Sequence, residues 1–405
     1  MDKPLPNVYR PSKFGAAGST KRRNSEDLPL SSWVLKCANG WVVLIASAVG
    51  AMVIIAAVVG GVAGGLASRK HSSAAVSSPP GGGGAGGGSG GGGGSPSAPT
   101  TGSSGCNSTS QWTFDETGHA NITMGNRTFY VHAPANYDNN RAHSVVLSFH
   151  GYSEDEANQE LITGLSQAGI WINNMGIIAV YPAGAWGPGK PYAGPQRAWQ
   201  GAPYAQPDVD DIAYTQDLLQ QIEQNMCVDS SRVYASGKSN GGGFVNLLAC
   251  TQSSASIFAA FAPVSAALYP ATDSFSGCNP GRNIPLVNLH GEDDTIEPMA
   301  GQTSEYGNTG YATPNIQSWR EQWASRDGCA DSLTDGVVND RIFQDTTLET
   351  WNCSTSDPRA TVQGYTIAGL GHSWPSTTGA DGGVTSFNAT QDVIIPFFEQ
   401  FTISL

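Results

Sequence analysis

A serine between two glycines joins two short apolar segments, and this arrangement strongly restricts the fold of the surrounding chain. The motif is Gly237-Lys238-Ser239-Asn240-Gly241, and it directly follows the apolar segment 233–236. The residues after it have helical spacing, at Phe244, Val245, Leu247 and Leu248. Glycines beside a serine allow a sharp turn that lifts the hydroxyl above the end of a strand. We therefore expect a strand, a tight turn and a helix, with Ser239 placed as a nucleophile.

The chain after residue 105 alternates short apolar segments with segments of helical periodicity. Uninterrupted apolar runs are typical of strands buried on both faces of a sheet. Such runs occupy residues 129–132, 145–149, 177–181, 233–236, 286–290 and 362–367. Helical spacing marks residues 212–226 and 393–401. This alternation predicts an α/β fold with a mostly parallel central sheet flanked by helices.

The first 105 residues differ in composition from the rest. No charged residue lies between Lys36 and Arg69, and about 20 apolar residues suffice for a helix to cross a bilayer. A cleavable signal segment is the alternative to a retained helix. We predict a basic cytosolic tail, a transmembrane signal-anchor helix, a flexible linker rich in glycine, serine and proline, and one globular domain, over residues 1–40, 41–66, 67–105 and 106–405.

The charges on either side of the apolar segment predict its orientation. More basic residues precede it than follow it closely, namely Lys21, Arg22, Arg23 and Lys36 against Arg69 and Lys70. Basic residues favour the cytosolic side. We therefore expect a single-pass type II membrane protein with an extracellular globular domain, either held at the membrane or released from it. The net charge of −13 argues against nucleic-acid binding, and the sequence does not indicate an oligomeric state.

Cysteines and glycosylation sequons agree with an extracellular domain. Six of the seven cysteines follow residue 105, and an even number suits disulfides formed in an oxidising compartment. The predicted pairs are Cys227–Cys250 and Cys329–Cys353, which are close in the sequence, and then Cys106–Cys278, which remain. Five Asn-x-Ser/Thr sequons lie in the same region, at Asn107, Asn121, Asn126, Asn352 and Asn388.

A nucleophilic serine needs a base, and the base needs an acid that orients it. His372 follows the last of the predicted strands, and Gly369 and Gly371 before it permit a loop over the edge of the sheet. The acid is expected between serine and histidine in the chain. Asp294 is the first choice and Asp293 the alternative, in the acidic loop after the strand 286–290. A metal site in this loop is disfavoured, because no histidine or cysteine has matching spacing.

Two backbone N–H groups are expected to bind the negative oxygen that forms when a serine attacks a carbonyl group. The first belongs to Asn240, directly after the nucleophile. The second belongs to Tyr152, in the sequence Phe149-His150-Gly151-Tyr152 that ends an early strand. Gly151 has no side chain and allows the backbone to approach a substrate closely.

With these motifs the chain resembles secreted fungal feruloyl esterases of the α/β-hydrolase type, which are related to acetylxylan esterases and polyhydroxybutyrate depolymerases. The resemblance covers roughly residues 106–405. It rests on blocks in the same order, at residues 198–204, 208–211, 237–244, His290-Gly291 with Asp294 and Pro298, and Gly371-His372-Ser373-Trp374-Pro375. The resemblance favours Asp294 over Asp293, because the family places its acid four residues after the histidine of the His-Gly pair.

The resemblance implies hydrolysis of ferulate or related hydroxycinnamate esters on plant cell-wall polysaccharides, without a cofactor. Trp199, Tyr204 and Trp374 become candidates for an aromatic acyl pocket, with core packing as the alternative. The same triad would also suit a polyhydroxyalkanoate depolymerase or an acetylxylan esterase. An alternative of another class is a catalytically inactive, membrane-tethered adhesion domain, which the complete triad disfavours. The N-terminal apolar segment and the glycine tract depart from the usual secreted members.

Overall fold

The computed structural model describes residues 36–37, 40–41, 102–270, 277–303, 312–328, 337–353 and 357–403. The chain divides into two compact units, Met1–Gly90 and Gly91–Leu405. In the first unit the described residues form two short antiparallel strands, β1 (Lys36–Cys37) and β2 (Gly40–Trp41). Residues 102–105 of the predicted linker are described as part of the second unit, where the Ser103 N–H donates to the Val228 carbonyl at 2.9 Å. The rest of the predicted tail, membrane helix and linker lies outside the described residues. No helix within the described ranges is long and apolar enough to cross a membrane.

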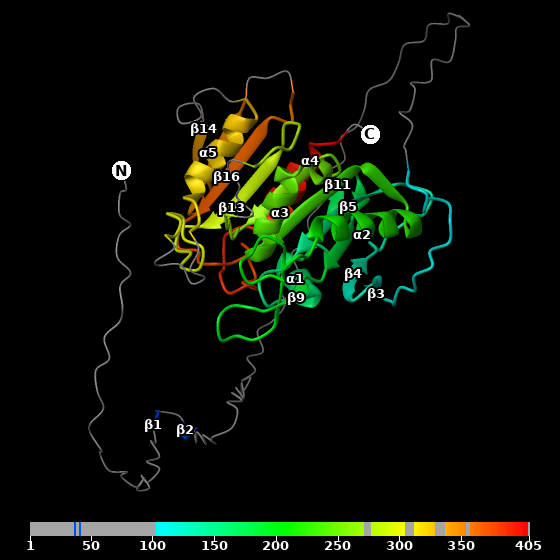
Figure 1. Cartoon of the computed structure of the whole chain (residues 1–405), viewed down its shortest axis with the longest axis horizontal. Coiled ribbons are helices and arrows are strands. Elements are labelled where there is room, and N and C mark those ends of the chain that lie inside the picture. The colour runs from blue at the N-terminus through cyan, green and yellow to red at the C-terminus, as the bar shows by residue number, and fades with distance from the viewer. Residues whose placement is uncertain are drawn as a thin grey trace, which may run out of the picture. The chain divides into compact units, whose positions relative to one another are not determined.

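The second unit is built on one large sheet (Figure 1). Its strands, as far as they are described, lie in the order β14-β15-β16-β13-β12-β11-β5-β8-β4-β3. Six of them, from β8 through β5, β11, β12 and β13 to β16, run parallel, and an antiparallel pair extends the sheet at each edge. Their bounds are β3 (His119–Met124), β4 (Arg127–His132), β5 (His143–Phe149), β8 (Ile178–Pro182), β11 (Val228–Lys238), β12 (Ala260–Val264), β13 (Leu286–Gly291), β14 (Val337–Phe343), β15 (Thr346–Asn352) and β16 (Thr361–Ile367).

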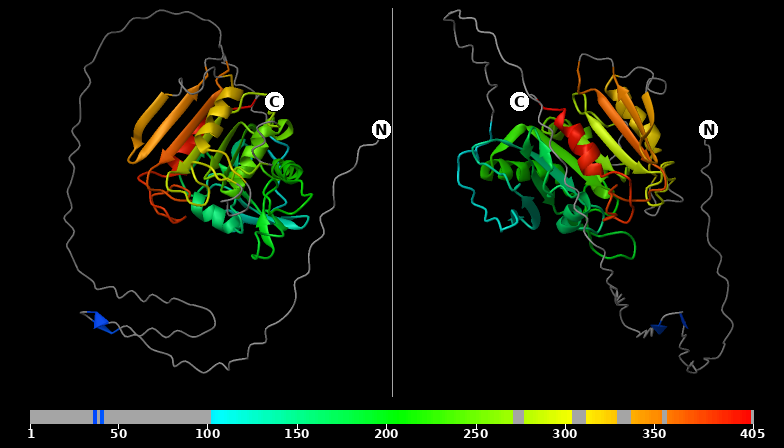
Figure 2. Two further views of the ribbon diagram at one scale, coloured as in Figure 1. Left: turned by 60° about the vertical axis from the view of Figure 1, so that its left-hand side comes forward. Right: turned by 180° about the vertical axis from the view of Figure 1, so that it is seen from behind.

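Helices cover both faces of this sheet (Figure 2). Val145 and Leu147 of β5 pack in one core cluster and Val146 in another, because alternate strand residues point to opposite faces. The first cluster includes side chains of α2 (Asp211–Asn225), α3 (Asn240–Cys250) and α5 (Ile316–Arg326). The second includes side chains of α1 (Glu156–Thr163), the π-helix η1 (Ala389–Ile394) and α6 (Ile395–Glu399). The expected α/β fold, with a buried parallel sheet, is confirmed.

All six predicted strands are present, and the large sheet contains four others that the sequence did not predict. Three of them are the antiparallel strands β3, β14 and β15 near the two edges of the sheet, and they contain many polar residues. The fourth is β12, which is central and fully buried but contains Pro263, a residue that usually argues against a central strand. The remaining described elements are short, namely α4 (Gln252–Ala255), β6 (Trp171–Ile172), β7 (Met175–Gly176), β9 (Ala185–Gly187) and β10 (Gln196–Ala198).

The disulfides differ from the predicted pairs. Cys106 is bonded to Cys227, and Cys250 to Cys278, so the predictions Cys227–Cys250 and Cys106–Cys278 were wrong. The segment before the sheet returns to the end of α2, where the Gly105 N–H donates to the Glu223 carbonyl at 2.7 Å and brings Cys106 beside Cys227. Closeness in the sequence could not reveal this contact.

The third predicted pair, Cys329–Cys353, remains a prediction. Cys353 is disulfide-bonded, and Cys329 lies outside the described residues. Of the sequon asparagines, Asn107, Asn121 and Asn126 are exposed, Asn388 is half-buried, and the Asn352 side chain is not described. Their glycosylation also remains a prediction.

Replacing Cys250 and Cys278 together by alanine should lower the free energy of unfolding by about 3–4 kcal/mol, because the bond closes a loop with a sequence separation of 28. Urea unfolding under non-reducing conditions measures this change. Cys37→Ala, which lies in the first unit, is the control and should leave the transition unchanged. A peptide linked through Cys227 and Cys250 in an unreduced digest would contradict the pairing.

Candidate active site

The turn between β11 and α3 has the strained geometry expected from the motif. Ser239 has φ 54° and ψ −119°, which is rare for a residue with a side chain. Its N–H donates to the Val264 carbonyl at 3.0 Å. A Cβ atom at Gly241 would lie 2.1 Å from the Phe149 carbonyl oxygen, and one at Gly237 would lie 2.7 Å from the Gly241 backbone. Both glycines are therefore required by the close approach of neighbouring backbone.

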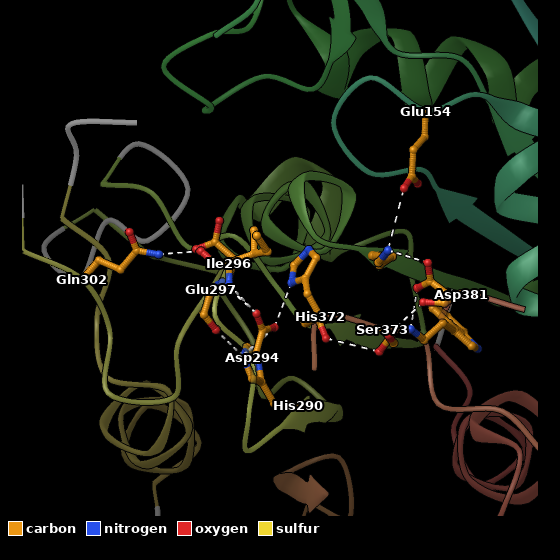
Figure 3. Close-up of polar contacts among 12 residues, drawn as sticks. Glu154, His290, Asp294, Ile296, Glu297, Gln302, His372, Ser373 and Asp381 are labelled. Atoms are coloured by element: carbon orange, nitrogen blue, oxygen red, sulfur yellow. Dashed lines mark hydrogen bonds and ion pairs between the residues drawn. The ribbon is translucent and has the colours of Figure 1, made fainter. Parts of the chain in front are cut away.

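The structure brings Asp294 and His372 together (Figure 3). The loop after β13 places Oδ2 of Asp294 2.8 Å from Nδ1 of His372, which lies in the loop after β16. Oδ1 of Asp294 accepts from the N–H groups of Ile296 and Glu297, each at 2.9 Å. Asp294 is buried, whereas the alternative acid Asp293 is exposed. Three bonds thus fix the Asp294 carboxylate and orient the imidazole.

Asp294 is held in its ionised form. Burial acts to raise the pKa of this carboxyl, but the hydrogen bond from His372 and the electrostatic attraction of its ring N–H outweigh burial, and the pKa is below its usual value. An ionised Asp294 makes Nδ1 of His372 the protonated nitrogen, which leaves Nε2 able to take a proton. His290 also lies near this carboxylate, with Nε2 3.5 Å from Oδ2. Burial lowers the pKa of His290 to about 4, so its imidazole is neutral at pH 7.

The loop after β5 presents the second predicted backbone donor. His150 is fully buried, with Nδ1 2.7 Å from the Gly151 carbonyl and Nε2 accepting from the Gly184 N–H at 2.9 Å. Among the described residues, no acceptor is hydrogen-bonded to the Tyr152 N–H. The Asn240 N–H is in the first turn of α3, where N–H groups have no partner within the helix. The two predicted oxyanion donors thus follow the same ends of neighbouring strands, since β5 and β11 are parallel and adjacent.

The three predicted substrate-binding aromatics have different environments. Trp199 is 0% and Trp374 1% exposed. Trp199 stacks on Phe244 at 5.2 Å between ring centroids. As placed, neither tryptophan borders open space, and the packing alternative fits both. Tyr204 differs, because it lines a cavity of about 590 Å³ formed with Pro188, Gly189, Lys190, Pro191, Tyr192, Gly194 and Pro203.

Glu297 is another buried acid in the loop after β13. It is 5% exposed, and its Oε1 accepts from the Tyr269 hydroxyl at 3.2 Å. The Tyr204 hydroxyl donates in turn to Tyr269 at 3.4 Å, so this chain connects the acid loop to the cavity. Burial raises the pKa of Glu297 to about 8. The carboxyl group is therefore mainly protonated at pH 7.

Lys238, Glu154 and Asp381 were also missed as site residues. The buried Lys238 ammonium contacts carboxylates from two other loops of the site, and Figure 3 shows Glu154 and Asp381 on the same side of His372. A charged lysine in an otherwise uncharged motif was a visible signal. Its partners are far away in the sequence and could not be identified from it.

Several known proteins are similar to this chain. Feruloyl esterase B of Piromyces equi is 27% identical over 204 residues, which is 50% of this chain and 36% of that protein. Probable feruloyl esterase C of Aspergillus clavatus is 29% identical over 185 residues, or 44% of this chain and 59% of that protein. The matched segment is thus less than two thirds of each relative. No protein-family model matches the chain.

Two solved structures are similar at lower identity. Acetyl xylan esterase from Aspergillus awamori has a TM-score of 0.42 at 16% identity, covering 62% of this chain and 93% of that one. Thermogutta terrifontis esterase 2 has a TM-score of 0.40 at 12% identity, covering 70% and 91%. At these values the two structures are not evidence for the fold of this chain. The chain's own strand order, the serine turn after β11 and the order of serine, acid and histidine define it as an α/β-hydrolase fold.

Glu297→Gln should stabilise the protein at alkaline pH. Because the folded pKa of about 8 exceeds the ordinary value of 4.5, the unfolded chain releases the proton first, and wild-type stability falls as pH rises from 4.5 to 8. Glutamine keeps the acceptor for Tyr269 and does not ionise. The variant's excess in Tm should grow across this interval in a calorimetric pH series. Glu292→Gln, in the same loop but exposed, is the control, and a flat difference for Glu297→Gln would refute the pKa assignment.

Proposed function

We propose that this protein is a serine carboxylic-ester hydrolase of the feruloyl esterase type, acting through Ser239, Asp294 and His372. The observation that carries the proposal is the 2.8 Å bond between Asp294 and His372 in the loops after β13 and β16, in a fold whose serine turn follows β11. The similarity to proteins named feruloyl esterase supports the substrate class. Tethering to a membrane, with the hydrolase domain outside the cell, is part of the proposal and is supported by the uncharged segment 41–66.

The proposed reaction is a two-step acyl transfer. His372 takes the proton from Ser239 as the serine oxygen bonds to the ester carbonyl carbon. The N–H groups of Asn240 and Tyr152 bind the oxyanion. The carbonyl then re-forms, and the alcohol leaves with the proton from His372. Water hydrolyses the acyl-enzyme with His372 again as base, releasing the acid and restoring Ser239.

The cavity bordered by Tyr204 supports an aromatic acyl group. Tyr204 packs edge-to-face on Tyr152 with 4.5 Å between ring centroids, and Tyr152 directly follows the Gly151 of the oxyanion loop. The Lys190 ammonium lies 4.9 Å from the Tyr152 ring centroid and 5.3 Å from that of Tyr204. Aromatic side chains and a cation in one cavity suit a planar acyl group that carries phenolic oxygens.

Ser239→Ala should abolish ester hydrolysis without unfolding the protein, because it removes only the nucleophilic oxygen. Asp294→Asn should reduce kcat by about 10⁴-fold, since an amide at this position favours the wrong imidazole tautomer. Release of ferulate from methyl ferulate measures both, with near-UV circular dichroism as the check on folding. Ser253→Ala, on the exposed surface of α4, is the matched control. Substantial activity in Ser239→Ala would refute the assignment.

A substrate panel tests the acyl preference. The chain 102–405 should have a higher kcat/KM on methyl ferulate than on acetylated xylan or short polyhydroxybutyrate, because the cavity is lined by aromatic rings. Faster hydrolysis of either of the other substrates would indicate an acetylxylan esterase or a depolymerase. A fluorophosphonate probe should label Ser239, whereas an inactive adhesion domain would remain unlabelled.

A further inference from the structure

Lys238 has no part in the mechanism above, although it is next to the nucleophile in the chain. Its side chain is only 6% exposed, and burying an ammonium group is costly unless the charge is compensated. Nζ donates to Oδ1 of Asp381 at 2.7 Å and lies 3.7 Å from Oε1 of Glu154. Two carboxylates from distant parts of the sequence therefore meet at this one cation.

Asp381 connects Lys238 to the loop of the histidine. While Oδ1 accepts from Lys238, Oδ2 accepts from the Trp374 N–H at 2.6 Å. The Asp381 carbonyl also accepts from the Ser373 hydroxyl at 2.8 Å, as Figure 3 shows for Ser373 and Asp381. Ser373 and Trp374 directly follow His372. A shift of the Asp381 carboxylate would thus move the backbone that carries the base.

Glu154 connects the same lysine to the oxyanion loop. Its Oε1 faces Lys238, and its Oε2 accepts from the Gly151 N–H at 3.0 Å. A Cβ atom at position 151 would lie 2.9 Å from this Oε2, so the glycine allows the carboxylate to approach the backbone. The next residue, Tyr152, supplies the proposed oxyanion donor. Glu154 therefore fixes the peptide that precedes this donor.

We propose that Lys238 is a positioning residue, which sets the His372 loop and the oxyanion loop at fixed places relative to Ser239. Each carboxylate binds Lys238 with one oxygen and a backbone N–H of its own catalytic loop with the other. Lys238 itself is joined to Ser239 by one peptide bond. The three loops are thereby connected through a single charge. This role rests on the proposed esterase function, because its effect is exerted on the geometry of the reacting groups.

Lys238→Met keeps most of the side-chain volume and removes the charge. We expect kcat on methyl ferulate to fall by about tenfold to a hundredfold, the usual effect of a displaced catalytic group. KM should change by less than about threefold, because no group that contacts the substrate is lost. Labelling by a fluorophosphonate should remain stoichiometric but slower. Lys238→Arg, which retains the cation, should recover part of kcat. If the buried ion pair only stabilised the fold, Lys238→Met would change Tm but would not lower kcat at a nearly constant KM.

Arg232→Met is the matched control. Arg232 lies earlier on the same strand, with Nε 3.7 Å from Oδ2 of Asp229 and the side chain 19% exposed, and it contacts no residue of the site. This variant should keep wild-type kcat and KM. Asp381→Asn combined with Lys238→Met should lower kcat little further than Lys238→Met alone, since both act on one contact.

The outcomes are distinguishable. A folded Lys238→Met variant with wild-type kcat, or with a change confined to KM, overturns the positioning role. If Lys238→Met does not fold, Glu154→Gln and Asp381→Asn decide. These carboxylates are 26% and 12% exposed, and wild-type kcat in both variants overturns the role equally. A wild-type protein that hydrolyses no ester and takes no fluorophosphonate label refutes the proposed function instead.

Discussion

The close approach of three backbone segments at Ser239 is the constraint on which the rest of the site depends. The Ser239 N–H bonds to the end of β12, and Gly241 lies so near the end of β5 that any side chain there would overlap the Phe149 carbonyl. This packing holds the serine at a positive φ, a conformation that costs free energy and persists only where the surroundings enforce it. The nucleophile is therefore placed by the sheet as a whole and not by its own loop.

Burial on both faces of the parallel sheet makes such a turn possible. Hydrophobic clusters on the two faces of the sheet fix the ends of the strands. The loops after β11, β13 and β16 all start from the C-terminal ends of parallel strands. The two buried acids of the loop after β13 differ in protonation state. Asp294 is ionised because His372 and two backbone N–H groups compensate its charge. Glu297, three residues later, receives too little compensation and holds a proton to about pH 8.

The sequence predicted the six apolar strands, the serine turn and the candidate acid and base, because each depends on a local pattern or on order along the chain. It failed where partners are far apart. Cys106 and Cys227 are separated by 121 residues, and nothing near either cysteine specifies the other. The substrate-binding roles of Trp199 and Trp374 stay predictions, and only the tertiary structure shows that both side chains are buried. The strand β12 was missed because its proline contradicts the usual pattern.

What the sequence by itself determined is the turn at Gly237 and Gly241, the buried parallel sheet that supports it, and the candidate residues in the order serine, acid, histidine. The tertiary structure alone decided the disulfide partners, the protonated state of Glu297, and the meeting of Lys238 with Glu154 and Asp381, residues 84 and 143 positions away. The reason is physical. Turn and strand preferences arise from neighbouring atoms, whereas the fate of a buried charge depends on every group that packing brings within a few ångströms.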